Sequence, residues 1–354
     1  MRERSISIPH LVHVGDSCLG DVARLLESYS FDLGRVCVAS GAGPSIVFAD
    51  KVVSHLRDAS VDVIALPDLQ GRLDQAAETA ALIIQESVSL IVGVGGGRVI
   101  DTVKLAAARS STEFISIPTT LSHDGISSPV ASLFGKDGQR RSYAAAMPAG
   151  IILDLRVVGS APVRTLRSGV GDLASNLIAL LDWQLADRMG LDRYDAFSAL
   201  IAESASRPVL DLVDLSRPES HEILAKGLLL SGLAMAAAGT SRPCSGAEHL
   251  ISHSLDELLG PRAAMHGEQV ALGCLVAAAA HDSPMLPTLH ELFTRLALPV
   301  HPTDLAITQE EMLEAVRAAP ATRPERYTVL SGLSADRDAA TLLERAFPAV
   351  GSRG

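Results

Sequence analysis

Four residues between positions 172 and 266 have side chains of the types that bind metal ions, at spacings that could bring them together. His249 and His253 are four residues apart in the helical pattern SGAEHLISHSLDELL, so both imidazoles would project from one helix face. His266 begins the next helical segment, HGEQVALGCL, directly after the break GPRA. Asp172 lies at the expected start of an apolar helix, SGVGDLASNLIALLDW, where a carboxylate also commonly acts as a helix cap.

One carboxylate and two imidazoles from three helices are a suitable ligand set for a catalytic zinc ion with an open position for water or substrate. Each residue also has an ordinary explanation, because a chain with eleven histidines contains an HxxxH pair by chance fairly often. The prediction of a metal site therefore rests on these residues taken together with the other motifs of the chain.

A glycine-rich turn in the N-terminal half has the composition of a phosphate-binding loop. Gly95, Gly96 and Gly97 follow the apolar run LIVGV and precede the helical segment RVIDTVKLAA, so backbone N–H groups could approach a pyrophosphate there. The motif departs from the G-x-G-x-x-G fingerprint, because Arg98 stands at the third glycine position. A simple tight turn would need the same small residues. Asp101, one turn into the helix, could reach the same ligand.

A polar segment, IPTTLSHDGISSP, follows the strand-like run FISIP. Its polar side chains would emerge at the carboxyl end of a parallel strand, where α/β sheets bind their ligands; they are Thr119, Thr120, Ser122, His123 and Asp124. Loops in that position usually carry function. We therefore expect this segment to lie beside the ligand.

The hydrophobic pattern indicates two domains that position these motifs. Short β-rich runs alternate with helical patterns and predict a parallel α/β sheet; the runs are residues 35–40, 61–66, 90–94, 114–118 and 150–155. Residues 126–147 interrupt the alternation with an expected hairpin around the turn KDGQ. Beyond it, Ala/Leu-rich helical segments run to about residue 347. We predict an α/β nucleotide-binding domain over residues 1–160 and an all-α metal- and substrate-binding domain over residues 161–354.

The composition favours a cytoplasmic enzyme with a small-molecule partner. A net charge of −11 without a basic run argues against nucleic-acid binding, and 3% aromatic residues argue against stacking on single-stranded bases. We expect no membrane insertion, because the apolar stretches are shorter than the roughly 20 residues that a bilayer requires. The four cysteines lack CxxC spacing and suit a reducing compartment. The Ala-rich segment ILAKGLLLSGLAMAAAG could pack internally or in a homo-oligomer.

Motifs across nearly the whole chain resemble those of the sn-glycerol-1-phosphate dehydrogenases, which share a superfamily with glycerol dehydrogenase, iron-type alcohol dehydrogenases and dehydroquinate synthase. They are GVGGGRVIDTVK, IPTTLSHDGISSP, SGVGDLASN, SGAEHLISHSLD, MHGEQVALG and RPERYTVL. The resemblance implies an NAD(P)-binding domain, a helical domain and a catalytic metal. The implied reaction interconverts dihydroxyacetone phosphate and sn-glycerol 1-phosphate, or a closely related pair of polyol phosphates, with NAD or NADP as the cofactor.

The resemblance also implies roles for individual residues. Asp172, His249 and His266 correspond to the metal ligands, and His253 lies beside the substrate as a proton relay. Asp124 is expected to hydrogen-bond a substrate hydroxyl. The residues expected to contact the cofactor are Gly95, Gly96, Gly97, Asp101, Thr119, Thr120, Leu121 and Ser122.

Departures from the family patterns bear on the metal, the cofactor and the substrate. Iron-type relatives have a histidine where this chain has Asn176, which favours zinc (Zn²⁺). The first predicted strand ends in Ser40 without an acidic residue, so both NAD and NADP are plausible. Candidates for the substrate phosphate include Arg164 and Arg207. The alternatives are a glycerol dehydrogenase-type enzyme for an unphosphorylated polyol or ketone, and a non-catalytic cofactor-binding homologue.

Overall fold

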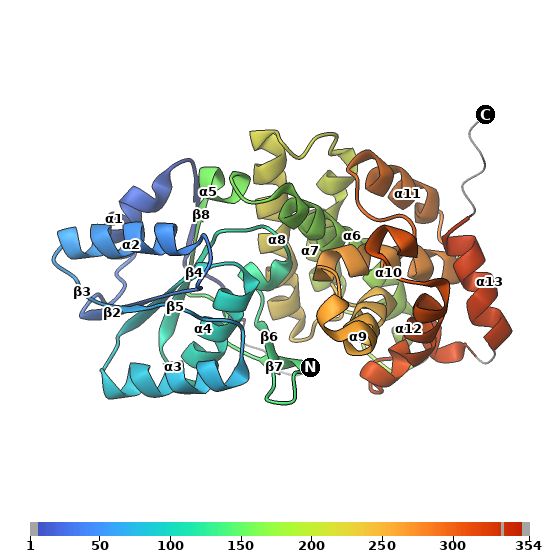
Figure 1. Ribbon diagram of the computed structural model, residues 1–354, viewed down its shortest axis with the longest axis horizontal. Helices are drawn as coiled ribbons and strands as arrows, with labels where there is room; N and C mark the ends of the chain where they lie inside the picture. Colours follow the sequence, from blue (N-terminus) through green and yellow to red (C-terminus); the bar gives the residue numbers. More distant parts are fainter. Residues whose placement is uncertain (1–5, 334–335, 349–354) are drawn as a thin grey trace. The chain divides into compact units, whose positions relative to one another are not determined.

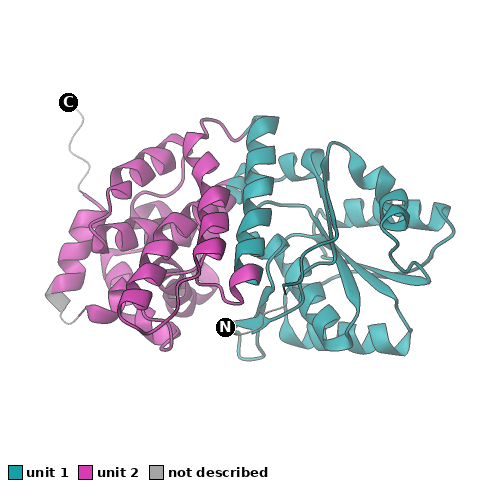
Figure 2. Ribbon diagram, turned by 180° about the vertical axis from the view of Figure 1, so that it is seen from behind, with its two compact units in different colours: residues 1–166, 216–236 teal, residues 167–215, 237–354 magenta. Residues whose placement is uncertain are grey.

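The computed structural model describes residues 6–333 and 336–348. The chain forms two compact units, residues 1–166 with 216–236 (unit 1) and residues 167–215 with 237–354 (unit 2), drawn in different colours in Figure 2. These units differ from the predicted domains, 1–160 and 161–354, chiefly in residues 216–236, which group with the sheet. The predicted domain boundary stays a prediction.

Unit 1 is built on a six-stranded parallel sheet with the strand order β1-β8-β5-β4-β2-β3. Its strands are β1 (Leu11–Gly15), β2 (Arg35–Ser40), β3 (Asp62–Leu66), β4 (Leu90–Gly95), β5 (Glu113–Pro118) and β8 (Gly150–Asp154). The five predicted runs are confirmed as strands. Strand β1 was not predicted from the sequence; it is a short edge strand in which Val12 is 51% exposed.

Helices cover both faces of this sheet (Figure 1). Along β2, Val36 and Val38 belong to the core under α1 and α2, while Cys37 and Ala39 belong to the core under α3 and α4. Because every residue of such a strand is buried on one face or the other, the strand is a continuous apolar run. The helices are α1 (Val22–Ser28), α2 (Ile46–Asp58), α3 (Leu73–Gln85) and α4 (Gly97–Ser110).

The remaining elements of unit 1 include the expected hairpin and one long apolar helix. Strands β6 (Val130–Phe134) and β7 (Arg140–Ala144) pair antiparallel, which confirms the hairpin. After the short helix α5 (Leu155–Gly159), most of α8 (Pro218–Ala238) belongs to this unit. By length and composition α8 could cross a membrane, but 61% of its most apolar window is buried within the fold. A core helix of a soluble protein has this pattern.

Unit 2 consists of helices and turns in the part of the chain that the structure describes, as predicted. Its helices are α6 (Val163–Arg188), α7 (Ala196–Ser206), α9 (Ala247–Leu259), α10 (His266–Ala280), α11 (Met285–Arg295), α12 (Gln309–Thr322) and α13 (Asp336–Ala346). The first four residues of α6 belong to unit 1, and unit 2 begins at residue 167. Helix α9 packs against α10 and α12, and α10 packs against α13.

The expected helix start near Asp172 is wrong. Helix α6 begins at Val163 and continues through the segment SGVG, so Asp172 lies inside the helix and does not cap it. Gly171 is required there for another reason, because a Cβ atom at this position would lie 2.1 Å from the carbonyl oxygen of Gly267 in α10. The glycine allows a close contact between two helices and does not end α6.

Candidate metal centre and nucleotide-binding loop

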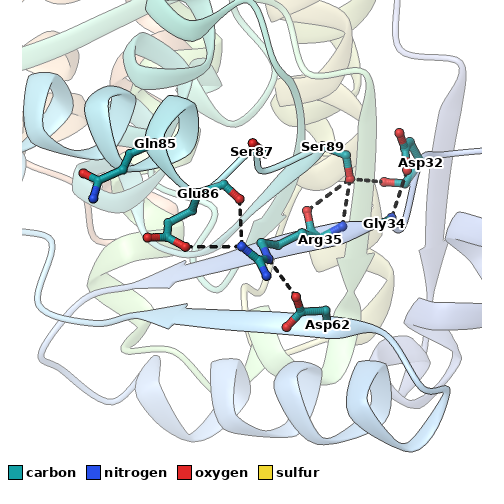
Figure 3. Close-up of a pocket in the computed structure, with 8 residues that line it drawn as sticks. All are labelled: Asp32, Gly34, Arg35, Asp62, Gln85, Glu86, Ser87 and Ser89. Carbon is teal, nitrogen blue, oxygen red and sulfur yellow. Dashed lines mark hydrogen bonds and ion pairs between the residues drawn. The ribbon is translucent and has the colours of Figure 1, made fainter.

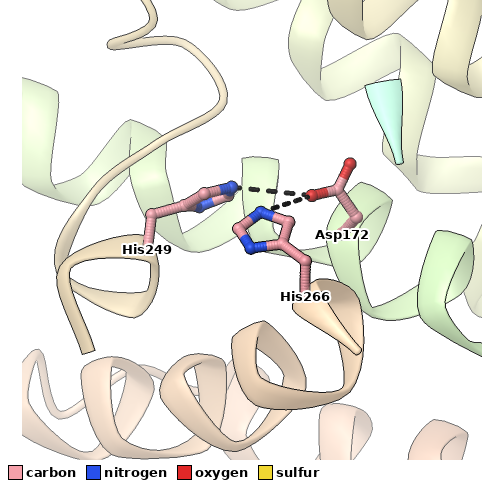
Figure 4. Close-up of side chains that lie close together, drawn as sticks. All are labelled: Asp172, His249 and His266. Atoms are coloured by element: carbon pink, nitrogen blue, oxygen red, sulfur yellow. Dashed lines mark ion pairs between the residues drawn. The ribbon is translucent and has the colours of Figure 1, made fainter. Parts of the chain in front are cut away.

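The structure brings one carboxylate and two imidazoles together inside unit 2. Asp172 Oδ1 lies 3.5 Å from His249 Nε2 and 3.5 Å from His266 Nε2 (Figure 4). The three ligand atoms lie within 4.8 Å of one another. Helices α6, α9 and α10 each contribute one of these side chains, which are 3%, 11% and 19% exposed, respectively.

This geometry fits a divalent cation. Two ligand atoms on a tetrahedral zinc ion, each about 2.0–2.1 Å from the metal, are about 3.3 Å apart. The distances of 3.5 Å from the carboxylate oxygen to the two ring nitrogens are close to this value. The two ring nitrogens lie within 4.8 Å of each other, so one ion could bind all three atoms once the imidazoles move closer together.

The charges around His249 also favour a cation. Burial alone lowers the pKa of this imidazole, but the neighbouring carboxylates of Asp172 and Glu248 outweigh that effect and raise the pKa from 6.5 to about 9. Glu248 is fully buried, and its Oε2 atom has no hydrogen-bond partner among the described residues. A buried carboxylate is stabilised by nearby positive charge, and a metal ion on His249 would add to the charge of the Arg326 guanidinium.

Helix packing fixes the positions of the ligands. The backbone N–H of Gly267 donates to Ser168 Oγ at 3.1 Å, and a Cβ atom at Gly267 would lie 1.7 Å from the Ser168 carbonyl oxygen. Together with the contact between Gly171 and Gly267, this brings the α10 and α6 backbones into direct contact beside His266 and Asp172. Two glycines adjacent to two ligands therefore set the ligand spacing.

His253 lies beside the three predicted ligands. Its ring centroid is 6.5 Å from that of His249 and 6.4 Å from that of His266. As expected from the four-residue spacing, His249 and His253 lie on the same helix, α9. The predicted role of His253 in catalysis stays a prediction.

Asn176 lies one turn after Asp172 on α6. Its side chain is fully buried, and its amide nitrogen donates to the carbonyl oxygen of Ala202 at 3.4 Å. The amide therefore takes part in the packing of α6 against α7.

In unit 1, the two predicted ligand-binding segments meet at the carboxyl edge of the sheet. Strand β4 ends at Gly95 and α4 begins at Gly97, so the glycines form the strand-to-helix turn. Strands β4 and β5 are paired in parallel, and the N–H of Thr119 donates to the Gly95 carbonyl at 3.0 Å. A Cβ atom at Gly96 would lie 3.2 Å from Thr120 Oγ1. The loop after β5 thus lies directly against the glycine turn.

Hydrogen bonds fix the side chains of Asp124 and His123 at the carboxyl edge of the sheet. The Asp124 carboxylate accepts a hydrogen bond of 2.9 Å from Ser231 Oγ of α8. His123 Nδ1 accepts from the N–H of Gly125 at 3.0 Å, and its ring fills the space in which Gly97 would have a Cβ atom. Glycine at position 97 is therefore needed for the imidazole as well as for the turn.

Asp101, Leu121 and Ser122, which were also predicted to contact the cofactor, are buried. Asp101 is 2% exposed; it forms an ion pair of 3.0 Å with Lys104 and accepts from the N–H of Ser132 at 3.1 Å. The carboxylate therefore connects α4 to β6. Leu121 is fully buried, and Ser122 is 9% exposed. The predicted contacts of these residues with a cofactor stay predictions.

A surface hollow in unit 1 lies away from these segments, at the amino ends of the strands (Figure 3). Arg35 at the start of β2 forms ion pairs with Asp62 and Glu86 at 2.7 Å and 3.2 Å. Parallel sheets bind their ligands at the opposite edge. None of the predicted site residues lines this hollow, which is formed by Asp32, Gly34, Arg35, Asp62, Gln85, Glu86, Ser87 and Ser89.

The two arginines proposed for a substrate phosphate are exposed. Arg207 pairs with Glu203 at 2.6 Å, and the two side chains are 61% and 41% exposed. Such a pair is typical of a solvated helix surface. Arg164 belongs to unit 1.

Three polar residues that contact the predicted site were not predicted from the sequence. Glu248 Oε1 lies 3.0 Å from His249 Nδ1, and Ser252 Oγ lies 3.1 Å from His266 Nδ1. Ser231 is the third, through its bond to Asp124. Glu248 and Ser252 were detectable, since a metal-binding histidine needs a partner for its second nitrogen and both residues are near ligands on α9. Ser231 is 107 residues from Asp124 and leaves no such signal.

Sequence comparison identifies a matching family model and curated relatives that share one name. Residues 13–162 match the family model of iron-containing alcohol dehydrogenases. The chain is 36% identical to the glycerol-1-phosphate dehydrogenase [NAD(P)+] of Thermococcus kodakarensis, with 95% of each chain covered. It is 33% identical to the enzyme of the same name from Methanothermobacter thermautotrophicus, with 98% of this chain and 99% of the relative covered.

Solved structures share the fold. Glycerol dehydrogenase from Schizosaccharomyces pombe superimposes with a TM-score of 0.78 at 23% identity, covering 98% of this chain and 91% of that one. Sulfoacetaldehyde reductase from Bifidobacterium kashiwanohense, solved with NAD+, gives a TM-score of 0.76 at 17% identity, covering 99% and 100%. From its full-length similarity to the curated relatives, the chain belongs to the glycerol-1-phosphate dehydrogenase family, within the iron-type alcohol dehydrogenase superfamily.

Proposed function

We propose that this protein is a zinc-dependent oxidoreductase that interconverts dihydroxyacetone phosphate and sn-glycerol 1-phosphate with NAD(P)H. The observation that carries the proposal is the buried group of Asp172, His249 and His266, in a chain 36% identical to a glycerol-1-phosphate dehydrogenase. When bound, the zinc ion would supply a Lewis acid that polarises the substrate carbonyl. The reduced nicotinamide would supply the hydride.

Zinc is favoured over iron by the ligand set. Two imidazoles and one carboxylate with an open position are a common catalytic zinc arrangement. The position that could offer a fourth protein ligand is Asn176, whose amide is used in helix packing. We therefore assign three protein ligands to the metal.

The residues of unit 1 would bind and orient the cofactor and the substrate. The N–H groups at Gly96 and Gly97, at the start of the 14-residue helix α4, are suited to the cofactor pyrophosphate. Thr119, Thr120 and Ser122 lie on the adjoining loop and would contact the rest of the cofactor, with Asp101 supporting the same helix. Asp124, held by Ser231, would accept a hydrogen bond from a substrate hydroxyl.

Reduction of the ketone requires a proton as well as the hydride. His253 is suited to supply it to the C2 oxygen, because an imidazole exchanges protons near neutral pH and this ring lies beside His249 and His266. In the reverse direction, His253 would accept the proton.

We also place the enzyme in the cytoplasm as a soluble protein. All four cysteines are free and buried, as expected for a reducing compartment. The net charge of −11 argues against a nucleic-acid partner and leaves a small-molecule substrate as the expected partner.

The decisive experiment measures NADH or NADPH oxidation by the purified protein with dihydroxyacetone phosphate. We expect turnover that a chelator abolishes and added zinc restores. The Asp172→Ala and His266→Ala variants should lose zinc and turnover but still bind nucleotide, because the glycine turn belongs to unit 1. Asp187→Ala, which alters an exposed carboxylate on the same helix as Asp172, is the matched control and should keep both.

The outcomes separate the alternatives. Absence of turnover by zinc-loaded protein would refute the proposed reaction. Turnover with dihydroxyacetone alone would favour an enzyme for unphosphorylated polyols. Full zinc retention by either ligand variant would refute the assigned metal ligands.

A further inference from the structure

Glu248 lies on the far side of the His249 ring from the predicted metal position. His249 Nε2 faces Asp172 Oδ1 at 3.5 Å, whereas His249 Nδ1 lies 3.0 Å from Glu248 Oε1. Both carboxylates are buried, Asp172 at 3% and Glu248 at 0% exposure. One imidazole is therefore placed between two carboxylates, one on each nitrogen.

The two ring nitrogens of a metal-binding histidine have different protonation requirements. The nitrogen that binds the metal must offer its lone pair, so the proton of the neutral ring must be on the other nitrogen. Glu248 Oε1, 3.0 Å from Nδ1, is placed to accept a hydrogen bond from a proton on that nitrogen. That leaves Nε2, the atom that faces Asp172 and the predicted metal, free to bind a cation.

We propose that Glu248 is a positioning residue that holds His249 in its metal-binding tautomer and places a buried negative charge behind it. This inference rests on the metal site proposed above. It adds a residue that has no role in the reaction as proposed there. Asp172 and Glu248 place one carboxyl group on each side of the His249 ring, and both would attract a divalent cation.

The surroundings of the Glu248 carboxylate favour the binding of a cation nearby. Its Oε2 atom is buried without a hydrogen-bond partner among the described residues. The nearby guanidinium of Arg326 interacts with Glu248 through its charge, but its hydrogen bonds go to the Ser245 carbonyl at 2.6 Å and Ser241 Oγ at 2.8 Å. Burying a carboxylate with one oxygen that lacks a hydrogen-bond partner is unfavourable, and a cation bound to His249 would offset part of that cost.

The fold fixes this carboxylate tightly. Glu248 Oε1 also accepts from the N–H of Gly246 at 2.5 Å. A Cβ atom at Gly246 would lie 3.0 Å from Glu248 Oε2, and one at Gly273 of α10 would lie 2.5 Å from the Glu248 carbonyl oxygen. At Gly273 a side chain would overlap the backbone of α9, so this glycine lets α10 pack directly against Glu248.

The other histidine has a weaker partner. His266 Nδ1 lies 3.1 Å from Ser252 Oγ, which also accepts from Gln269 Nε2 at 3.2 Å. A neutral hydroxyl orients the ring but adds no charge. The asymmetry predicts that removal of Glu248 affects the metal more than removal of Ser252.

A purely structural role for Glu248 is the competing explanation, because its bond to Gly246 stabilises the start of α9. Asp182 offers the matched control. It is a fully buried carboxylate that accepts from the N–H of Ala247, the first residue of the same helix, at 2.6 Å. Its other hydrogen-bond partners are the His281 imidazole and the N–H of Val329, so it stabilises the helix start without contacting a predicted metal ligand.

The test measures zinc affinity by competition with a chromophoric chelator, and the absorption spectrum of the Co²⁺-substituted protein. We compare the unaltered protein with the E248Q, S252A and D182N variants. E248Q should weaken zinc binding about 10- to 100-fold and shift the Co²⁺ bands, because the amide keeps the shape but not the charge. S252A should weaken binding less. D182N should lower the melting temperature and leave zinc affinity and the Co²⁺ spectrum unchanged.

A measurement on the unaltered protein keeps the inference testable if E248Q does not fold. The ¹⁵N chemical shifts of His249 in the zinc-bound protein should show a protonated Nδ1 and a metal-bound Nε2. The opposite arrangement, or an E248Q variant with unchanged zinc affinity and an unchanged Co²⁺ spectrum, would overturn the role of Glu248. Failure of the unaltered protein to bind zinc would instead refute the metal site, and this inference with it.

Discussion

Single hydrogen bonds between distant residues complete the predicted site. Asp124 was recognised from its place after a strand, but the partner that holds its carboxylate, Ser231, belongs to a helix far along the chain. The same is true within unit 2, where Asp172 lies 77 residues before His249 in the sequence and 3.5 Å from it in space. The chemistry of these residues depends on neighbours that they acquire only on folding.

For the hydrogen bond between Ser231 and Asp124, we predict that Ser231→Ala lowers kcat/KM for dihydroxyacetone phosphate roughly 10- to 100-fold. A hydrogen bond to a charged group contributes about 1.5–3 kcal/mol, and without it the Asp124 carboxylate is less well oriented toward the substrate. Steady-state kinetics check this. Zinc content should be unchanged, because the metal ligands belong to unit 2. Unchanged kcat/KM in the variant would show that Ser231 does not position Asp124.

Helices α6 and α10 are held in backbone contact by two glycines, and each glycine is adjacent to a predicted metal ligand. Gly171 precedes Asp172, and Gly267 follows His266. A side chain at either position would overlap the backbone of the other helix. The requirement for glycine therefore comes from helix packing, and it controls the distance between the two ligands.

Gly267→Ala should consequently impair both stability and metal binding. Overpacking of a core typically costs about 1–3 kcal/mol, and here the added Cβ atom would lie 1.7 Å from the Ser168 carbonyl and push His266 away from Asp172. Thermal unfolding and zinc titration measure the two effects. The control is Gly332→Ala in unit 2, where a Cβ atom has nothing within 4 Å. Full zinc affinity in Gly267→Ala would contradict this account of the ligand spacing.

The whole molecule divides its predicted chemistry between two units. The glycine turn and its adjoining loop belong to unit 1, and the metal ligands belong to unit 2. Each unit also contains two buried cysteines, Cys18 and Cys37 in unit 1 and Cys244 and Cys274 in unit 2. These thiols can report on the stability of each unit separately.

We predict slow thiol labelling in the native protein at about pH 8. Burial raises the pKa of Cys18 to about 11 and that of Cys37 to about 12, and it raises the pKa of Cys274 well above 9, so few thiolates are present. Removal of zinc should accelerate labelling of Cys244 and Cys274 more than that of Cys18 and Cys37, because a ligand stabilises the unit that binds it. Mass spectrometry of labelled peptides distinguishes them. Equal acceleration in both units would contradict a metal site confined to unit 2.

Much of this architecture was predictable from local patterns. Buried parallel strands are continuous apolar runs, and the turn of Gly95 to Gly97 between a strand and a helix has a strong local signal. Strand β1 was missed because LVHVG is short, lies at a sheet edge and pairs with β8, which begins 139 residues after β1 begins. Asp172 was misplaced relative to its helix because glycines usually end helices, and only the packing against α10 explains their presence inside one.

The sequence by itself determined which residues can do chemistry, because donor atoms and turn-forming glycines are properties of residue types and their spacing. Only the tertiary structure decided which of those residues meet. The 3.5 Å distances from Asp172 to His249 and His266, the carboxylate of Glu248 behind His249 and the contact of Ser231 with Asp124 all join separate elements or depend on how those elements pack. Such contacts are set by close packing of the whole core, which no local stretch of sequence encodes.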